Sequence, residues 1–138
     1  MQKTLLIILA VLLALLALGG YILLDRMFPL ASPIQCPSED EITSISVAQE
    51  QGAFASITAS EIPQLLEYIC SGEPTRQWSV QDYPTAENYY TVEIQTSGRM
   101  YRYFVYADGS QTYVESPYEG VYKVEPDVLD FLADCMKK

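Results

Sequence analysis

The stretch Tyr89–Glu115, YYTVEIQTSGRMYRYFVYADGSQTYVE, contains three runs with the composition of β-strands. They are rich in tyrosine and β-branched residues, which favour strands, and short turn-forming connections, Ser97-Gly98 and Ala107-Asp108-Gly109, separate them. The runs are Tyr89–Thr96, Met100–Tyr106 and Gln111–Glu115. The stretch therefore predicts an antiparallel meander.

The residues upstream of the meander predict a hairpin followed by a helix. Glu41–Ala48 has the alternation of a strand that turns at Gln51-Gly52 into a second strand near Phe54–Thr58. The first strand places Thr43, Ile45 and Val47 on one face. Ser60 is the expected N-cap of the helix that follows, and Ser71-Gly72 ends it. Apolar residues at helical spacing within that helix are Ile62, Leu65, Leu66 and Ile69.

Downstream of the meander, Gly120–Val124 predicts a last short strand, and Pro126 starts a C-terminal amphipathic helix. The segment Pro74–Pro84 has prolines at both ends and predicts a loop or edge strand that crosses the domain, anchored by Trp78. The predicted fold class is α+β, with element order β-β-α-β-β-β-β-α. It is an antiparallel sheet with two helices on one face, which leaves the other face for solvent or a partner.

The N-terminal part predicts a transmembrane anchor ahead of the domain. Residues 5–24 are apolar apart from the phenol of Tyr21, and a helix of this length spans about 30 Å, the thickness of a bilayer's hydrocarbon core. Residues 1–4 form a short cytoplasmic tail, 25–38 a proline-containing linker, and 39–138 an extracytoplasmic domain. Two positive charges, Lys3 and the α-amino group, precede the apolar run, and one, Arg26, follows it. This excess of positive charge favours a cytoplasmic N-terminus and a single-pass cell-membrane protein.

A cleaved signal peptide is the alternative, which would leave the domain secreted. Ala17-Leu18-Gly19 is the candidate cleavage site, but the apolar run continues to Leu24, and we favour the uncleaved anchor. Lipid modification at Cys36 is disfavoured because Gln35 stands where a small residue is expected.

Charge and composition exclude several classes of function. From Glu39 onward, 17 acidic and 6 basic residues give a net charge of −11, which argues against a nucleic-acid partner. The chain has no histidine, which removes the usual general base and the imidazole metal ligand. We therefore expect no catalytic residue, no metal site and no cofactor, and expect that the protein is not an enzyme.

Three cysteines, Cys36, Cys70 and Cys135, allow at most one intramolecular disulfide. Cys70 and Cys135 lie near the apolar sides of the two predicted helices and would meet if those helices pack side by side. Buried free thiols are the favoured interpretation, with the Cys70–Cys135 pair as the open alternative.

Four groups of residues carry a resemblance to a known family. They are Ile62-Pro63-x-Leu65-Leu66, Pro74-Thr75-Arg76-x-x-Ser79-Val80-x-Asp82-x-Pro84, Tyr90-x-Val92-x-Ile94, and Tyr113-x-Glu115-x-Pro117-Tyr118-x-Gly120-x-Tyr122. Across Ile42–Leu132 the chain resembles an uncharacterised family, a domain of unknown function, found in exported proteins of Gram-positive bacteria. The resemblance implies export and a fold boundary, and it transfers no catalytic residue.

The tyrosines are the most suggestive feature for function, because the chain contains 11 and most fall in the predicted sheet. Period-two alternation places Tyr89 outward and Tyr90 inward. Arg76 and Asp82 lie in the predicted loop, where a salt bridge between them would fix its shape. The candidate binding surface is Trp78, Tyr89, Tyr101, Tyr103, Tyr113, Tyr118, Arg76 and Asp82.

Three functions are compatible with this sequence. The first is a binding or sensing module of the cell envelope, in which the tyrosine-rich face or the Pro117–Gly120 loop contacts a protein, a peptide or a glycan. The second is a small carboxylate-using envelope enzyme, with Glu115 and Glu119 or Asp82 and Glu87 as acid–base pairs. The third is an accessory or inhibitory subunit of another membrane protein.

Overall fold

A computed structural model describes residues 1–138 as two compact units, Met1–Leu30 and Ala31–Lys138. The first unit contains helix α1 (Gln2–Met27), which extends beyond the predicted residues 5–24 at both ends. It is the one helix long and apolar enough to cross a membrane, and a signal sequence would have the same properties.

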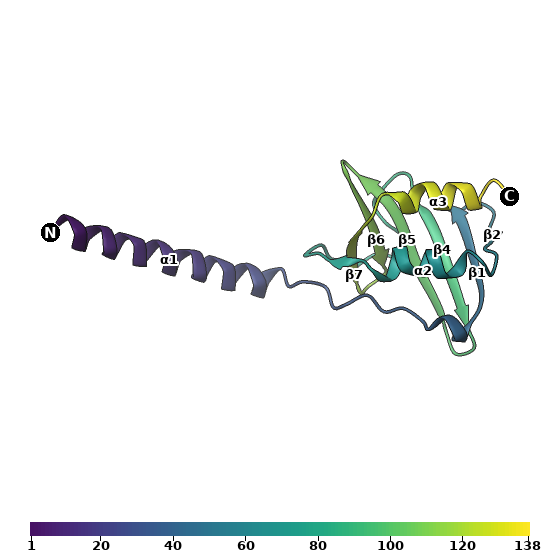
Figure 1. Cartoon of the computed structure of the whole chain (residues 1–138), viewed down its shortest axis with the longest axis horizontal. Helices are drawn as coiled ribbons and strands as arrows, with labels where there is room; N and C mark the ends of the chain where they lie inside the picture. The colour runs from purple at the N-terminus through teal and green to yellow at the C-terminus, as the bar shows by residue number, and fades with distance from the viewer. The chain divides into compact units, whose positions relative to one another are not determined.

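The second unit is built on one antiparallel sheet of seven strands in the order β2-β1-β4-β5-β6-β7-β3 (Figure 1). The predicted meander is its centre, because β4, β5, β6 and β7 are consecutive neighbours in both chain and sheet. The strands are β1 (Ile42–Gln49), β2 (Ala55–Ser56), β3 (Glu73–Pro74), β4 (Tyr90–Thr96), β5 (Met100–Asp108), β6 (Gln111–Ser116) and β7 (Gly120–Val124).

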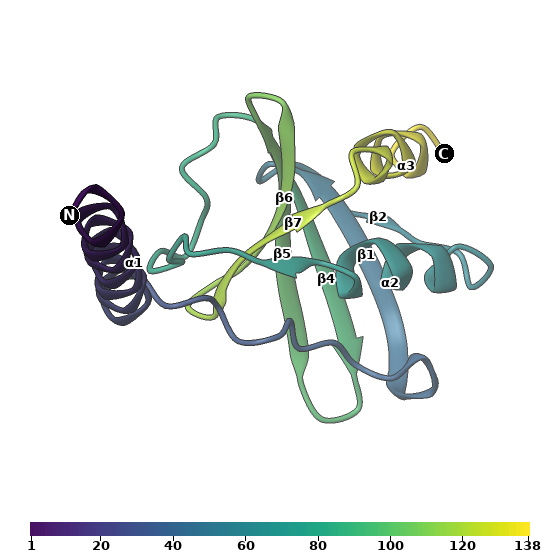
Figure 2. The same cartoon turned by 60° about the vertical axis from the view of Figure 1, so that its left-hand side comes forward.

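Helices α2 (Ile62–Cys70) and α3 (Asp127–Cys135) lie on the same face of the sheet (Figures 1 and 2). Their apolar sides bury the inward side chains of the central strands, which form a single core. Its fully buried members include Val47, Leu65, Val92, Val105, Val114, Val128 and Leu132. The predicted α+β fold class is therefore confirmed, with β3 as one short strand beyond the predicted order.

Two local predictions were wrong for identifiable reasons. The register of β1 against β4 shifts between Ile42 and Ser44, and such a bulge changes which side chains face the core. Thr43 is therefore exposed, and its hydroxyl donates to the Gln95 carbonyl at 3.0 Å. Helix α2 begins at Ile62, and its N-cap is Glu61 and not the predicted Ser60.

Residues 31–38, predicted as part of the linker, belong to the second unit and form a strap. The strap packs against the inner face of the sheet, which is the face that α2 and α3 cover (Figure 2). The Tyr122 hydroxyl donates to the Ser32 carbonyl at 2.7 Å, and the Tyr103 hydroxyl donates to the Gln35 carbonyl. Ile34 packs on the core. The compact unit begins at Ala31 because inward tyrosines satisfy backbone carbonyls that an exposed linker would leave to water.

A disulfide joins the strap to the end of α2. Cys36 pairs with Cys70, 34 residues apart, and Cys135 is a buried free thiol. The structure therefore excludes the Cys70–Cys135 pair that the sequence left open, and it overturns the interpretation of Cys70 as a free thiol.

The outer face of the sheet, opposite the helices, is covered by residues 75–89, which connect β3 to β4. We call these residues the covering segment. Phe104 contacts Tyr83 and Tyr89, with ring centroids 5.8 and 5.5 Å apart, and Phe104 is fully buried. Trp78 is 64% exposed, so it does not anchor this segment as predicted. The sequence did not predict that this segment covers the sheet, because no local pattern around Tyr83 and Tyr89 shows that their rings pack on Phe104.

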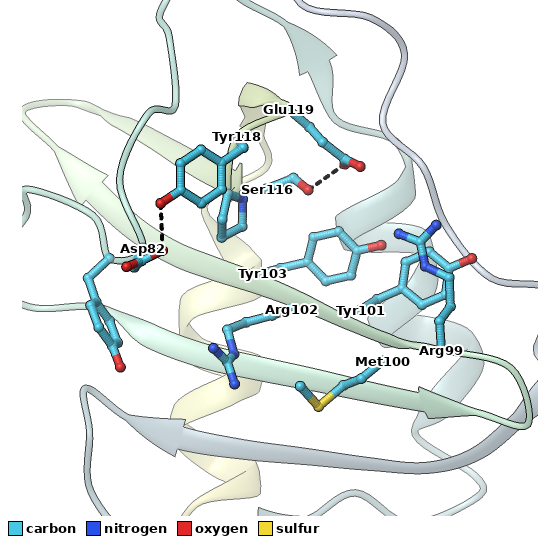
Figure 3. A pocket seen from close by; sticks show the side chains of 11 residues that line it. Asp82, Arg99, Met100, Tyr101, Arg102, Tyr103, Ser116, Tyr118 and Glu119 are labelled. Carbon is cyan, nitrogen blue, oxygen red and sulfur yellow. Dashed lines mark hydrogen bonds between the residues drawn. The ribbon is translucent and has the colours of Figure 1, made fainter.

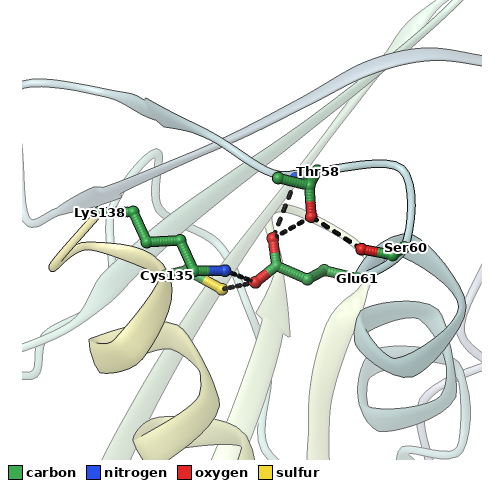
Figure 4. A network of polar contacts seen from close by, with 5 residues as sticks. All are labelled: Thr58, Ser60, Glu61, Cys135 and Lys138. Carbon is green, nitrogen blue, oxygen red and sulfur yellow. Dashed lines mark hydrogen bonds and ion pairs between the residues drawn. The ribbon is translucent and has the colours of Figure 1, made fainter.

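Glu61 connects the start of α2 to the end of α3 (Figure 4). Its carboxylate accepts hydrogen bonds from the Thr58 amide at 3.0 Å and the Thr58 hydroxyl at 2.6 Å, and it forms an ion pair with Lys138. These contacts, led by Lys138, lower the pKa of Glu61 to about 2. Burial raises the pKa of the adjacent Cys135 thiol, and Glu61 adds to that effect, so Cys135 is held as a neutral thiol.

Removing the disulfide should destabilise the second unit. Closing a loop of this length restricts the unfolded chain, so Cys36→Ser should lower the free energy of unfolding by about 2–4 kcal/mol in a denaturant titration. Dithiothreitol should lower the wild-type value by a similar amount and leave the Cys36→Ser value unchanged. An effect of reductant on the variant would contradict the Cys36–Cys70 pairing.

Acid should remove the contribution of Glu61 to stability. Because the folded-state pKa is about 2 and the ordinary value is 4.5, this contribution is present above pH 4.5 and is lost as the pH falls toward 2. Glu61→Gln should therefore be less stable than wild type at pH 7, and the difference should shrink as the pH falls and vanish below about pH 2. A difference that is equal at both pH values would argue against the ionic contact.

Candidate functional site

The candidate cleft of the second unit, about 450 Å³ in volume, lies between the start of β5 and the β6–β7 turn (Figure 3). In Figure 3 the hydrogen-bonded pair of Tyr118 and Asp82 stands at one side, and Tyr101 lies beside Arg99 at the other. The lining residues are Asp82, Tyr83, Arg99–Tyr103 and Ser116–Glu119. Three chain segments, separated in sequence, therefore meet around one space.

Tyr118 stands in this cleft on a strained backbone. The Glu119 amide donates to the Ser116 carbonyl at 3.0 Å, which closes a four-residue turn with Pro117 second and Tyr118 third. Tyr118 has φ of 63°, the left-handed conformation that glycine usually supplies at this position of a type II turn. A side chain there costs on the order of 1 kcal/mol, so other contacts must hold the tyrosine in place.

A buried carboxylate organises those contacts. Glu115 accepts hydrogen bonds from the Ser79 hydroxyl at 2.7 Å and from the Tyr106 hydroxyl at 3.1 Å, so both its oxygens have donors. The Ser79 hydroxyl in turn accepts the Tyr118 amide at 3.2 Å. The covering segment and the strained turn are therefore fastened to the same buried carboxylate.

Asp82 completes the turn's attachment from the solvent side. It accepts a hydrogen bond from the Tyr118 hydroxyl at 2.6 Å, and this bond raises the pKa of that phenol. Ser116 donates to Glu119 at 2.6 Å within the turn itself. Both carboxylates of the cleft thus accept hydrogen bonds from neighbouring side chains.

The opposite wall is aromatic and cationic. The Arg99 guanidinium lies 4.0 Å from the centre of the Tyr101 ring, a cation–π contact, and Tyr101 stacks on Tyr103 at 6.4 Å. Arg102 pairs with Glu93 at 2.7 Å. Burial, reinforced by Glu119, raises the pKa of Tyr103, so this phenol remains a neutral hydrogen-bond donor.

Half of the exposed large apolar side chains of the second unit line this cleft. Of its large apolar residues that are exposed, Tyr83, Met100 and Tyr118 line the cleft. Trp78 and Val80 flank Ser79, which is bonded to the Tyr118 amide. Only Phe54 lies outside both groups. An exposed apolar patch of this kind is typical of interaction sites.

The structure separates the residues of the candidate binding surface into groups. Asp82, Tyr101, Tyr103 and Tyr118 line the cleft together. Tyr89 is buried against Phe104, and Tyr113 packs on Tyr106 at 6.0 Å on the covered outer face. Trp78 is exposed, and Arg76 is half-buried at the start of the covering segment. Asp82, predicted to fix the shape of the loop, accepts the hydrogen bond from the Tyr118 hydroxyl.

Several cleft residues were not predicted. Arg99, Met100 and Arg102 follow the Ser97-Gly98 turn, and Tyr83 lies in the covering segment. The sequence did contain one signal for Arg99 and Met100 as cleft residues, which is their position next to a turn at the start of a strand. The Pro117–Gly120 loop was predicted as a contact region, and it does supply one wall.

The proposed acid–base pairs do not share a cleft. Asp82 lines the candidate cleft, whereas Glu87 lines a separate one of about 400 Å³ beside Tyr106. Glu115 is 6% exposed beneath the covering segment, whereas Glu119 faces the candidate cleft. No group of three or more acidic or cysteine side chains lies close enough together to hold a metal ion.

Comparison with known proteins places this unit in a family. The profile of the DUF5301 family, described as "Domain of unknown function (DUF5300)", matches residues 30–123, more than half of the chain. The chain belongs to the DUF5301 family. The match starts beside Ala31, which agrees with the strap being part of the DUF5301 domain.

A solved structure has a similar fold. The NMR structure of the protein from Ruminococcus gnavus is 29% identical, has a TM-score of 0.58, and aligns over 70% of this chain and 99% of its own. Comparison with curated proteins finds no match. The relatives therefore support the DUF5301 fold and assign no chemistry to its cleft.

Substitutions at Tyr118 should show an inverted order of stability. Because φ at this residue is 63°, Tyr118→Gly should be more stable than Tyr118→Ala by about 1 kcal/mol in a denaturant titration. The exposed strand residue Lys123 is the matched control, where alanine should be more stable than glycine. The same order at both positions would show that the Tyr118 backbone is not strained.

Proposed function

We propose that this DUF5301 chain is an extracytoplasmic binding module tethered to the membrane by α1, and that the cleft beside Tyr118 is its ligand site. The observation that carries the proposal is that the exposed side chains of Tyr83, Met100 and Tyr118 line one cleft, where Tyr118 is held in a strained conformation. Backbone strain persists only where surrounding contacts maintain it, and it concentrates at functional sites.

The proposed location is supported by the disulfide and the apolar helix together. Disulfides persist in oxidising compartments and are rare in the cytoplasm. Cys36 of this disulfide follows, along the chain, a helix that is long enough to cross a membrane. Both observations favour export of the domain, with α1 as the anchor.

Binding is favoured over catalysis by how the cleft's carboxylates are used. Asp82 and Glu119 accept hydrogen bonds from Tyr118 and Ser116, and these bonds shape the turn. The cleft has tyrosine side chains on both walls, Tyr118 on one and Tyr101 and Tyr103 on the other, which suits recognition of a ligand's surface.

The binding proposal can be tested with the full chain in lipid nanodiscs, probed with a random 12-residue peptide library and a glycan array. Ligands of the wild type should bind Tyr118→Gly at least about tenfold more weakly, because the aromatic anchor is removed. Phe54→Ser removes an exposed ring outside the cleft and should leave affinity unchanged.

Two results would refute the proposal. One is that neither library yields a ligand. The other is that Tyr118→Gly and Phe54→Ser have equal affinity for every ligand found, which would place binding away from the cleft.

A further inference from the structure

The cleft contains a free strand edge. β5 pairs with β4 from Met100 to Val105, but its pairing with β6 ends at Phe104 opposite Glu115. The first residues of β5, Met100–Tyr103, therefore have a neighbour strand on the β4 side only. The chain of β6 has already turned away, and Pro117 has no amide with which to continue the ladder.

The register identifies which backbone groups face this open edge. The Thr96 amide donates to the Arg99 carbonyl at 2.9 Å, so hydrogen-bonded pairs between β4 and β5 fall at alternate residues from there. Tyr101 and Tyr103 consequently direct their amides and carbonyls to β4. Met100 and Arg102 direct theirs to the open edge, and both residues line the cleft.

We propose that an extended segment of another exported protein adds to this edge of β5 as an extra strand, in the cleft beside Tyr118. The proposal rests on the proposed binding function and names its ligand class and mode. Backbone groups of Met100 and Arg102 pair with the incoming segment, a recognised way in which exposed sheet edges bind peptides. Side chains of that segment alternate between the two sides of the cleft.

The surroundings define the chemistry of the segment. Met100, Tyr83 and Tyr118 are exposed apolar contacts, so apolar residues are expected where the segment meets them. The Asp82 and Glu119 carboxylates of the cleft accept hydrogen bonds from neutral hydroxyl groups, and the residues from Glu39 onward have a net charge of −11. Charge complementarity therefore places basic residues of the segment beside Asp82 and Glu119, and not beside Arg99 and Arg102 on the opposite wall.

A second copy of the chain is a poorer occupant of this edge. Two domains with the same strong negative charge repel one another. Edge-to-edge pairing of two β5 strands would also bring Arg99 and Arg102 of both copies close together.

The test uses the full chain in nanodiscs and a linear peptide selected from the random 12-residue library. Each peptide residue is N-methylated in turn, which removes one amide donor and blocks one edge. Affinity should fall by about tenfold or more at every second residue of the bound stretch and change little at the residues between. Loss of affinity without this period-two pattern would overturn strand addition.

Amide hydrogen exchange of the ¹⁵N-labelled chain provides an independent measurement. The amides of Met100 and Arg102 should exchange fast in the free protein and become protected at least about tenfold by the selected peptide. Tyr101 and Tyr103, already bonded to β4, are internal controls that should be protected in both states. Unchanged exchange at Met100 and Arg102 would contradict the proposal.

The outcomes separate this inference from the binding proposal. Peptides that depend on Tyr118 but show no alternation refute strand addition and leave the cleft as a binding site. Binding of glycans alone, or self-association through β5 in place of peptide binding, also refutes strand addition. If no ligand binds, both proposals fail.

Discussion

The central strand β5 has bulky side chains on both faces, and both faces must be kept from water. Tyr103 and Val105 point to the inner face, whereas Phe104 and Tyr106 point to the outer face, and all four are buried. A sheet covered on one side only would leave Phe104 and Tyr106 in solvent, at a cost of about 1.5–3 kcal/mol for a side chain of this size. The rest of the second unit follows from this requirement.

Each face is covered in a different way. The helices α2 and α3, together with residues 31–38, cover the inner face, and tyrosine hydroxyls of the sheet satisfy carbonyls of those residues. The outer face is covered by residues 75–89, a segment without helix or strand that follows the short β3. That segment is attached through buried Glu115, which takes donors from Ser79 and Tyr106 and leaves no buried oxygen unpaired.

The cleft arises where this double coverage ends. β5 extends beyond β6 because the chain reverses at Pro117, and the covering segment reaches the turn only through Ser79 and Asp82. The free edge, Met100–Tyr103, is short; Arg99 directly precedes it and Arg102 lies within it. Charged residues on an edge strand oppose indiscriminate edge-to-edge pairing. The binding role proposed for this edge thus uses a part of the sheet that the fold does not need for its own core.

The sequence by itself determined the elements whose local patterns are strong. Period-two alternation with hairpin turns located β4, β5 and β6, helical spacing located α2 and α3, and an unbroken apolar run located α1. Tertiary structure alone decided the Cys36–Cys70 pair, the packing of residues 31–38 and the burial of Tyr89, because each depends on residues far apart in the chain. It also decided the cleft. Alternation assigns a side chain to a face, but only the meeting of β5, the Tyr118 turn and Asp82 shows which faces stay open.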